Sequence, residues 1–169
     1  MCGIAGYYGR TQKTENILNA TLDSMIHRGP NNKEKYENVT NEINTYLLHT
    51  RLSIIDLDKR SNQPFRIGTN ILILNGEIYN YIELRKELED LGHKFITSGD
   101  TEVLAKVLLN WGLEGVKRLE GMWAFCWFRE TDQTLTLCRD RFGEKPLYYF
   151  EENGELYFAS EPKSIFALF

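Results

Sequence analysis

The second residue of the chain is a cysteine, and its position is typical of a catalytic nucleophile. An initiator methionine is generally removed when the next residue is small, which would leave Cys2 with a free α-amine. An α-amine has a pKa of roughly 7.7–8.0, so about a tenth of it is unprotonated at pH 7. Such a base beside a thiol can replace the histidine of a cysteine–histidine pair. The alternative is a cysteine without chemistry that merely precedes a strand.

Asn75 and Gly76 directly follow a short apolar segment, Ile71 to Leu74. A side-chain amide and the next backbone N–H can point the same way and stabilise an oxyanion. Asn-Gly is also the strongest short signal for a hairpin or tight turn, because both residues tolerate positive φ. From these two residues alone, the turn is the favoured interpretation.

Two charged residues could bind the termini of an amino acid. Arg51 lies in an otherwise apolar segment, Thr45 to Leu52, and a buried arginine must be paired. Its fork suits a substrate carboxylate, although an internal carboxylate would serve equally well. Asp100 precedes a predicted helix, where it could cap the helix or hold an ammonium group. With the thiol and the Asn-Gly pair, these residues describe a site for an α-amino acid that carries a side-chain amide.

Other kinds of chemistry find little support in the sequence. Cys126 and Cys138 lie in apolar strand-like segments and are predicted to be structural, so a disulfide framework is disfavoured. The three histidines share no zinc-ligand spacing, and no metal site is expected. Charge is −4 with no basic excess, so nucleic acid and acidic membranes are unlikely partners by composition. No apolar run reaches the roughly 18 residues of a membrane span. The N-terminus does not resemble a signal peptide, and with three cysteines that suggest no disulfide framework a reducing cytoplasm is expected.

The 169 residues predict one domain, 1–169, that alternates strands with a few helices. Strands are predicted for Ile4 to Tyr8, Thr45 to Leu52, Ile71 to Leu74, Gly121 to Arg129, Thr134 to Arg139, Leu147 to Phe150 and Glu155 to Ala159. Helices are predicted for Thr14 to His27, Tyr81 to Leu91, Thr101 to Trp111 and Pro162 to Phe169.

Several details of this outline are open to test. Asn80 is expected to cap the second helix, Asn31 to Asn44 to be a loop or an edge strand, and Ser61 to Gly68 a connection. The last four strands follow one another through short turns, which predicts a β-meander. The class is α+β, with helices layered on antiparallel sheet.

The motifs, taken together, resemble the class II glutamine amidotransferase domain, an N-terminal nucleophile (Ntn) hydrolase, of glutamine-dependent asparagine synthetases. Nine segments match in family order: Cys2 to Gly6, His27 to Pro30, His49 to Asp56, Gln63-Pro64, Leu74 to Asn80, Ser98 to Glu102, Leu119 to Phe125, Arg139 to Tyr149 and Ala159 to Glu161. The branch that contains glucosamine-phosphate synthase would show Thr-Arg-Trp-Ala-Thr-His-Gly instead, and that segment is absent.

The resemblance implies a role for each matching residue. Cys2 attacks the carboxamide of L-glutamine, its α-amine acts as base, and a thioester forms that water hydrolyses to glutamate. Asn75 and Gly76 stabilise the oxyanion, while Arg51 binds the α-carboxylate. Asp100 and Glu77 bind the α-ammonium. The backbone around Leu52, Ser53, Ile54 and Ile55 completes the pocket.

The resemblance also implies a four-layer αββα sandwich of two antiparallel sheets and no cofactor in this domain. Family members carry a second, ATP- and magnesium-using synthetase domain with a Ser-Gly-Gly-x-Asp-Ser loop, and the chain lacks that segment. The expected partner is therefore an ammonia-accepting synthetase domain on the same chain or a separate subunit, with aspartate as the default acceptor and a homodimer as one possible assembly. A standalone glutaminase is the alternative.

Two other interpretations remain open. A glutamine-sensing or interaction module without catalysis would not need the nucleophile, and the same glutaminase unit could serve the modification of sugars or peptides. An amidase or acylase with another substrate fits less well with the charges of Arg51 and Asp100. One departure from the family pattern is Asn31, which stands where an aspartate commonly follows His-Arg-Gly-Pro.

Overall fold

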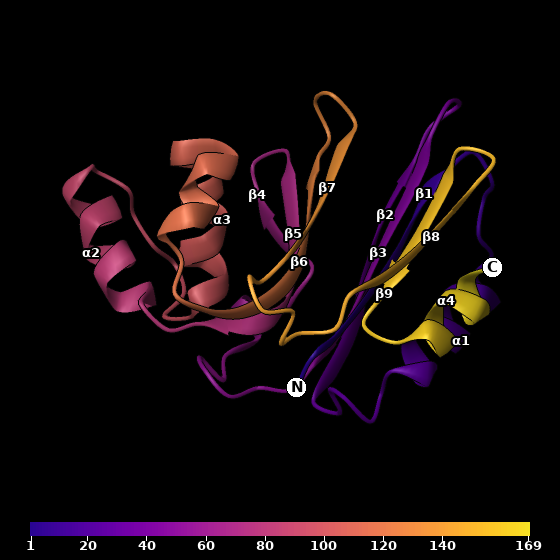
Figure 1. The fold of residues 1–169 in the computed structure, drawn as a ribbon, viewed down its shortest axis with the longest axis horizontal. Coiled ribbons are helices and arrows are strands. Elements are labelled where there is room, and N and C mark those ends of the chain that lie inside the picture. Colours follow the sequence, from indigo (N-terminus) through magenta and orange to yellow (C-terminus); the bar gives the residue numbers. More distant parts are fainter.

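The structure, a computed structural model, describes residues 1–169 as four layers. Two antiparallel sheets pack face to face; α2 and α3 cover the outer face of one, and α1 and α4 cover the outer face of the other (Figure 1). The α+β class and the paired antiparallel sheets are confirmed. None of the helices has the length and apolar character needed to cross a bilayer.

The strands divide into a five-stranded and a four-stranded sheet. Sheet A has the order β2-β3-β1-β9-β8 and consists of β1 (Gly3–Gly9), β2 (Asn32–Val39), β3 (Asn44–Arg51), β8 (Tyr148–Glu152) and β9 (Glu155–Ala159). Sheet B has the order β4-β5-β6-β7 and consists of β4 (Phe65–Ile67), β5 (Asn70–Ile78), β6 (Gly121–Arg129) and β7 (Thr134–Arg139). The helices are α1 (Glu15–Ser24), α2 (Tyr81–Asp90), α3 (Asp100–Trp111) and α4 (Pro162–Leu168), with short 3-10 turns at Lys59–Ser61 and Gly112–Arg118.

The Asn-Gly pair is not a turn, and that favoured interpretation is wrong. Strand β5 continues through both residues to Ile78, with Asn75 opposite Ala124 and Gly76 opposite Trp123 of β6. A Cβ at position 76 would lie 2.4 Å from the carbonyl oxygen of Met122. Glycine is therefore used here for close approach between two strands rather than for positive φ.

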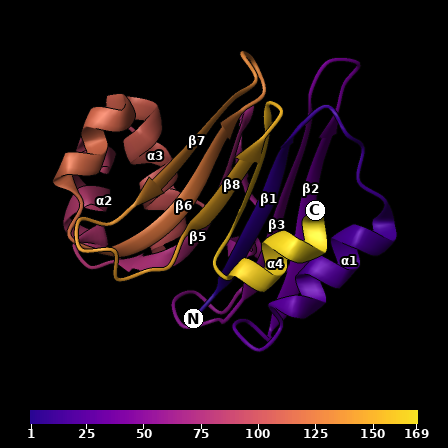
Figure 2. The ribbon, with the colours of Figure 1, turned by 45° about the vertical axis from the view of Figure 1, so that its right-hand side comes forward.

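The predicted meander is also wrong. Strands β6 and β7 form a hairpin in sheet B, whereas β8 and β9 form a hairpin in sheet A (Figure 2). Hydrophobic alternation identifies strands but does not state which sheet they join. The edge-strand alternative for residues 31–44 is confirmed by β2, and the expected connection over residues 61–68 contains β4.

The predicted helix caps differ from the observed ones. Asn80 stands at the start of α2 but does not cap it: its Nδ2 donates to the carbonyl of Arg118 at 2.9 Å, and its Oδ1 accepts from the N–H of Glu120 at 3.0 Å. Helix α3 begins at Asp100, after Gly99, so the Asp100 side chain is available for other contacts.

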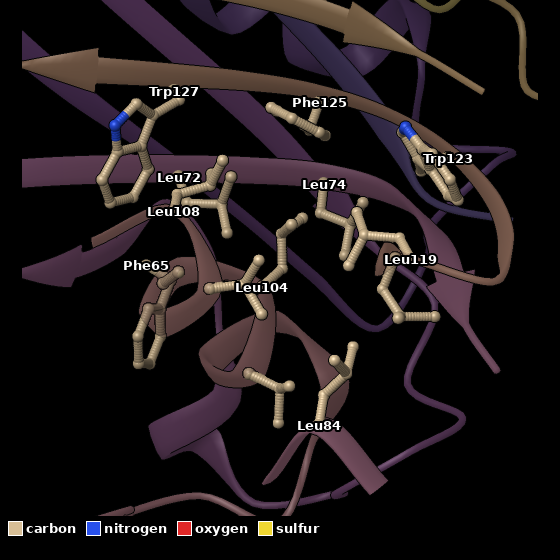
Figure 3. Close-up of a cluster of buried hydrophobic side chains, with 14 of the residues drawn as sticks. Phe65, Leu72, Leu74, Leu84, Leu104, Leu108, Leu119, Trp123, Phe125 and Trp127 are labelled. Carbon is tan, nitrogen blue, oxygen red and sulfur yellow. The ribbon is translucent and has the colours of Figure 1, made fainter. Parts of the chain in front are cut away.

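Three apolar clusters hold the four layers together. The largest lies between sheet B and α2 and α3, where Leu104 and Leu108 of α3 and Leu84 of α2 pack under strand side chains such as Leu72 and Phe125 (Figure 3). A second lies between sheet A and the helices α1 and α4, and a third fills the space between the sheets. Each sheet is thus buried on both faces, which fixes the strand ends that form the site.

Candidate active site

A pocket of about 140 Å³ opens where β1 begins, at the ends of both sheets. It is lined by the N-terminus, the loop after β3, the end of β5, the start of α3 and Lys145. Among its lining residues are nearly all those predicted to act on a substrate: Cys2, Arg51, Leu52, Ile54, Ile55, Asn75, Gly76, Glu77 and Asp100. Cys2 and Asp100, which are 98 positions apart in the sequence, thus meet at one place.

Ser53 is the one predicted binding residue outside this lining. Its backbone N–H donates to Oδ1 of Asn31 at 2.9 Å, while the N–H of Asn31 donates to the carbonyl of Arg51 at 3.0 Å. Asn31 therefore ties the loop after β3 to the neighbouring segment. The bond uses an oxygen that an aspartate would also provide, so the substitution keeps this contact and removes only a charge.

Cys2 is held in front of β1 by contacts on both sides. Its Sγ accepts a hydrogen bond from the N–H of Leu52 at 3.4 Å, and its carbonyl accepts from Nε of Arg28 at 2.9 Å. Burial raises the pKa of the Cys2 thiol, an effect that outweighs the lowering by the Leu52 N–H and by nearby positive charge. The thiol is therefore protonated at neutral pH, and a base must remove its proton before it can attack.

Asn75 presents a buried amide with no partner. The residue is 1% exposed, and neither its Oδ1 nor its Nδ2 makes a hydrogen bond. The preceding residue is held firmly, because Nε2 of His49 lies 3.2 Å from the carbonyl of Leu74 and the Leu74 N–H donates to Oε1 of Gln63 at 2.6 Å. Burial lowers the pKa of His49 to about 3, so the ring is neutral and donates through Nε2.

Arg51 is buried, yet no carboxylate neutralises it. Its guanidinium donates to the backbone carbonyls of Ile55, Asp56 and Asp58, and to Oδ1 of Asn62 at 2.7 Å. All of these acceptors are neutral. The internal carboxylate considered as an alternative partner is not present, and the side chain both shapes the loop after β3 and keeps a net positive charge at the pocket.

Two carboxylates reach the same pocket, Glu77 from β5 of sheet B and Asp100 from the start of α3. Oδ2 of Asp100 accepts a hydrogen bond from the N–H of Ile78 at 3.0 Å. Burial raises the pKa of Asp100, and the neighbouring charge of Glu77 acts in the same direction. Neither carboxylate takes part in an ion pair within the protein, so both remain available to a positively charged group.

Eight lining residues were not singled out as site residues from the sequence, among them Gln63, Thr101 and Lys145. Gln63 joins two walls, because its Nε2 donates to Oγ1 of Thr101 at 3.3 Å while its Oε1 accepts from Leu74. Gln63, Thr101 and Lys145 each lie in one of the segments that match the family, and this membership was the signal that could have identified them. No group of three or more histidine, cysteine or acidic side chains is arranged to hold a metal ion.

A cysteine at the head of a central strand, in a pair of antiparallel sheets that are each covered by helices, is the arrangement of the Ntn fold. The chain belongs to the glutamine amidotransferase domain family, whose profile matches residues 1–169. The solved structure of glutamine phosphoribosylpyrophosphate amidotransferase from Bacillus subtilis has the same fold, with a TM-score of 0.80 and 22% identity over 99% of this chain and 43% of that one.

Two sequence relatives show which members of this family the chain is similar to. Asparagine synthetase [glutamine-hydrolyzing] 1 of Bacillus subtilis is 39% identical over 98% of this chain, and the fungal protein amidase chry2 of Gibberella zeae is 33% identical over 99%. The chain spans 26% of the length of each of these relatives. The domain is therefore related to asparagine synthetases, while the reaction of a whole protein is a separate question.

Proposed function

We propose that this domain hydrolyses L-glutamine to glutamate and ammonia and passes the ammonia to an ATP-dependent, amide-forming domain. The observation that carries the proposal is the buried, unpartnered amide of Asn75 in the same pocket as the Cys2 thiol. A buried polar group without a partner is unfavourable unless a ligand supplies one. An oxyanion formed beside Cys2 would accept a hydrogen bond from Nδ2 of Asn75.

The charges of the pocket match the two ends of an α-amino acid. The uncompensated Arg51 would attract the α-carboxylate, and Asp100 with Glu77 would attract the α-ammonium. With both ends held, the side-chain amide of glutamine would extend toward Cys2. The shape and the charges together favour glutamine over a neutral amide.

The reaction would proceed in two steps at Cys2. The α-amine takes the thiol proton, Sγ attacks the carboxamide carbon, and Nδ2 of Asn75 and the N–H of Gly76 stabilise the oxyanion. As the C–N bond breaks, the amine returns the proton and ammonia leaves. Water then attacks the thioester, again with the amine as base, and releases glutamate and the free thiol.

The ammonia acceptor is proposed from the relatives alone. Aspartate is the first candidate, because asparagine synthetases are similar over nearly the whole chain. Amidase chry2 of Gibberella zeae is similar to nearly the same extent, so another amide product is the second candidate. ATP and magnesium would act in the accepting domain.

Glutamate release from purified chain tests the proposal. The wild type should convert glutamine to glutamate and ammonia in equal amounts, and Cys2→Ala should abolish turnover while glutamine still binds by calorimetry. Cys138→Ser is a matched control, because this second partly buried cysteine lies on β7 outside the pocket. Turnover that survives in Cys2→Ala would refute the mechanism, and binding without turnover in the wild type would favour a sensing module.

Removal of Met1 offers a second test. In the structure Met1 is present and lines the pocket, and the nitrogen of Cys2 is then an amide without basic character. Chain that retains Met1, identified by intact mass, should be inactive, and trimming with a methionine aminopeptidase should restore activity. Full turnover with Met1 retained would exclude the α-amine as the base.

A further inference from the structure

Lys145 is a buried cation that the mechanism above does not use. The residue is 6% exposed, forms no ion pair, and lines the pocket near the N-terminus. Its Nζ has one side-chain contact, the sulfur of Met1 at 3.3 Å. A thioether is a weak acceptor, so the ammonium is effectively without a partner. Buried charges are normally paired, so this arrangement calls for an explanation.

The backbone around Lys145 is fixed independently of Met1. The carboxylate of Asp140 accepts the N–H groups of Phe142, Glu144 and Lys145 at 2.9 to 3.1 Å, and it also accepts the N–H of Trp123 on β6 at 3.3 Å. Nε of Arg139 donates to the Lys145 carbonyl at 2.7 Å. Loss of Met1 would therefore leave the lysine beside the new N-terminus.

We propose that the Lys145 ammonium disfavours protonation of the Cys2 α-amine and so keeps that amine ready to act as the base. This inference rests on the proposed glutamine hydrolysis. Lys145 does not touch the reacting atoms in this role; it acts on the base by repulsion between like charges. The side chain that contacts Lys145 belongs to Met1, and removal of Met1 creates the α-amine of Cys2.

The distance from Nζ of Lys145 to the nitrogen of Cys2 is short enough for charge repulsion to lower the pKa of the α-amine. Met1 joins Lys145 to the Cys2 nitrogen through one side chain and one peptide bond, so Nζ lies within about 10 Å of that nitrogen by standard bond lengths. A unit charge at about 10 Å shifts a pKa by roughly 0.3 to 1 unit, depending on the local dielectric. Without the lysine, the amine would bind a proton more tightly by that amount.

Other charges around the amine act in both directions. Arg51 adds positive charge, whereas Glu77 and Asp100 add negative charge across the pocket. The guanidinium of Arg28 donates to the Cys2 carbonyl, but Glu161 pairs with it at 3.0 Å. The two free carboxylates would raise the pKa of the amine, and Lys145 offsets them with a charge that no protein carboxylate neutralises.

The pH dependence of glutamine hydrolysis tests the proposal. In Lys145→Met, which keeps the length of the side chain and removes the charge, the acidic limb of kcat/KM should move up by roughly 0.3 to 1 pH unit. At pH 6 this corresponds to about a two- to tenfold loss, with little loss above pH 9. Lys145→Arg is the matched control, because it keeps the charge and should keep the wild-type profile.

A second measurement reads the amine without turnover. In a Cys2→Ser background, cyanate modifies the unprotonated N-terminal amine at a rate that follows its titration, as seen in the mass of the N-terminal peptide. Lys145→Met should raise the apparent pKa in this assay by a similar amount. If the wild type did not hydrolyse glutamine but the amine still shifted, the proposed function would fail while the role of Lys145 would stand.

Two results would overturn the role of Lys145. One is an amine titration and a pH profile that do not change in Lys145→Met, once thermal melting shows that the variant is folded. The other is a rise in KM for glutamine at every pH with an unchanged acidic limb, which would make Lys145 a ligand for the substrate carboxylate.

Discussion

Strand β1 connects two buried polar regions of opposite character. At its far end, Tyr7, Lys13, Glu155 and Tyr157 form a tyrosine cluster in which the groups satisfy one another. The hydroxyls of Tyr7 and Tyr157 donate to the two oxygens of Glu155 at 2.6 and 2.9 Å, and Nζ of Lys13 donates to the hydroxyl of Tyr157 at 3.2 Å. This closed network joins β1, the segment that follows it and β9.

At the near end of β1, beside Cys2, the pocket contains polar groups that lack a partner in the protein. The side-chain amide of Asn75 has no hydrogen bond, Nζ of Lys145 contacts only a thioether, and Arg51 has no carboxylate partner. The difference separates two uses of buried polarity. Buried polar groups that have partners in the protein stabilise the fold. Buried polar groups without partners destabilise it and are oriented for a ligand. Substitutions in the two regions should therefore affect different properties.

The largest effect is expected for Asn75→Ala. Because the amide has no partner in the protein, its loss should change the melting temperature little. Loss of one oxyanion donor lowers kcat by about 10²- to 10³-fold in comparable sites, and a similar loss is expected here with KM nearly unchanged. Steady-state glutamate release and thermal melting measure both. A variant that is strongly destabilised but fully active would reverse the assignment.

The next effect is expected for Arg51→Lys, which keeps a charge and loses the fork. Lysine cannot hold the carbonyls of Ile55, Asp56 and Asp58 together, so the loop after β3 should loosen. KM for glutamine should rise by about 10- to 100-fold, which equals the loss of one or two charge-assisted hydrogen bonds. An unchanged KM would remove Arg51 from substrate binding.

A smaller effect on stability, and none on activity, is expected in the tyrosine cluster. Tyr157→Phe removes one donor from Glu155 and the acceptor for Lys13, which should lower the free energy of unfolding by about 1 to 3 kcal/mol. Urea unfolding measures it, and Tyr149→Phe is a matched control at a tyrosine that is 70% exposed. A loss of glutaminase rate at unchanged stability would show that the two regions are coupled.

The smallest effect is a pH dependence of stability. Hydrogen bonds from Thr11 and Tyr7 lower the pKa of Glu155 to about 2. Because the folded pKa lies below the unfolded value near 4.3, this stabilisation is complete above about pH 4.3 and is lost as the pH falls toward 2. The difference in urea midpoint between wild type and Glu155→Gln should shrink over that range. A constant difference would show that the carboxylate charge is not responsible.

The sequence predicted the residues of the site better than the structure around them. Cys2, Arg51, Asn75 and Asp100 meet as expected, because their types suit one reaction and their order matches a family. Lys145 was missed, because a lysine after a turn looks like an exposed residue, and its burial depends on the N-H groups gathered by Asp140. Ser53 was included for its neighbours, although its N–H is bonded to Asn31 instead of facing the pocket.

The predictions of the fold were wrong where pairing between strands distant in the sequence overrides the preferences of the local sequence. The Asn-Gly pair lies within a strand because β6 runs alongside it, and no local pattern reports a strand that arrives about 50 residues later. The split of the last four strands between two sheets has the same origin. Even so, the class and the helices followed from hydrophobic periodicity alone.

Strand β1 lies between β3 and β9, so strands that lie more than 100 residues apart in the sequence flank it. Gly6 pairs with Leu47 on one side and with Phe158 on the other. During synthesis, the strand that carries the nucleophile is made first but gains its second neighbour last. A nascent chain that lacks β9 would leave one edge of β1 unpaired and Cys2 less firmly held, so the arrangement of the pocket would be complete only after β9 has emerged.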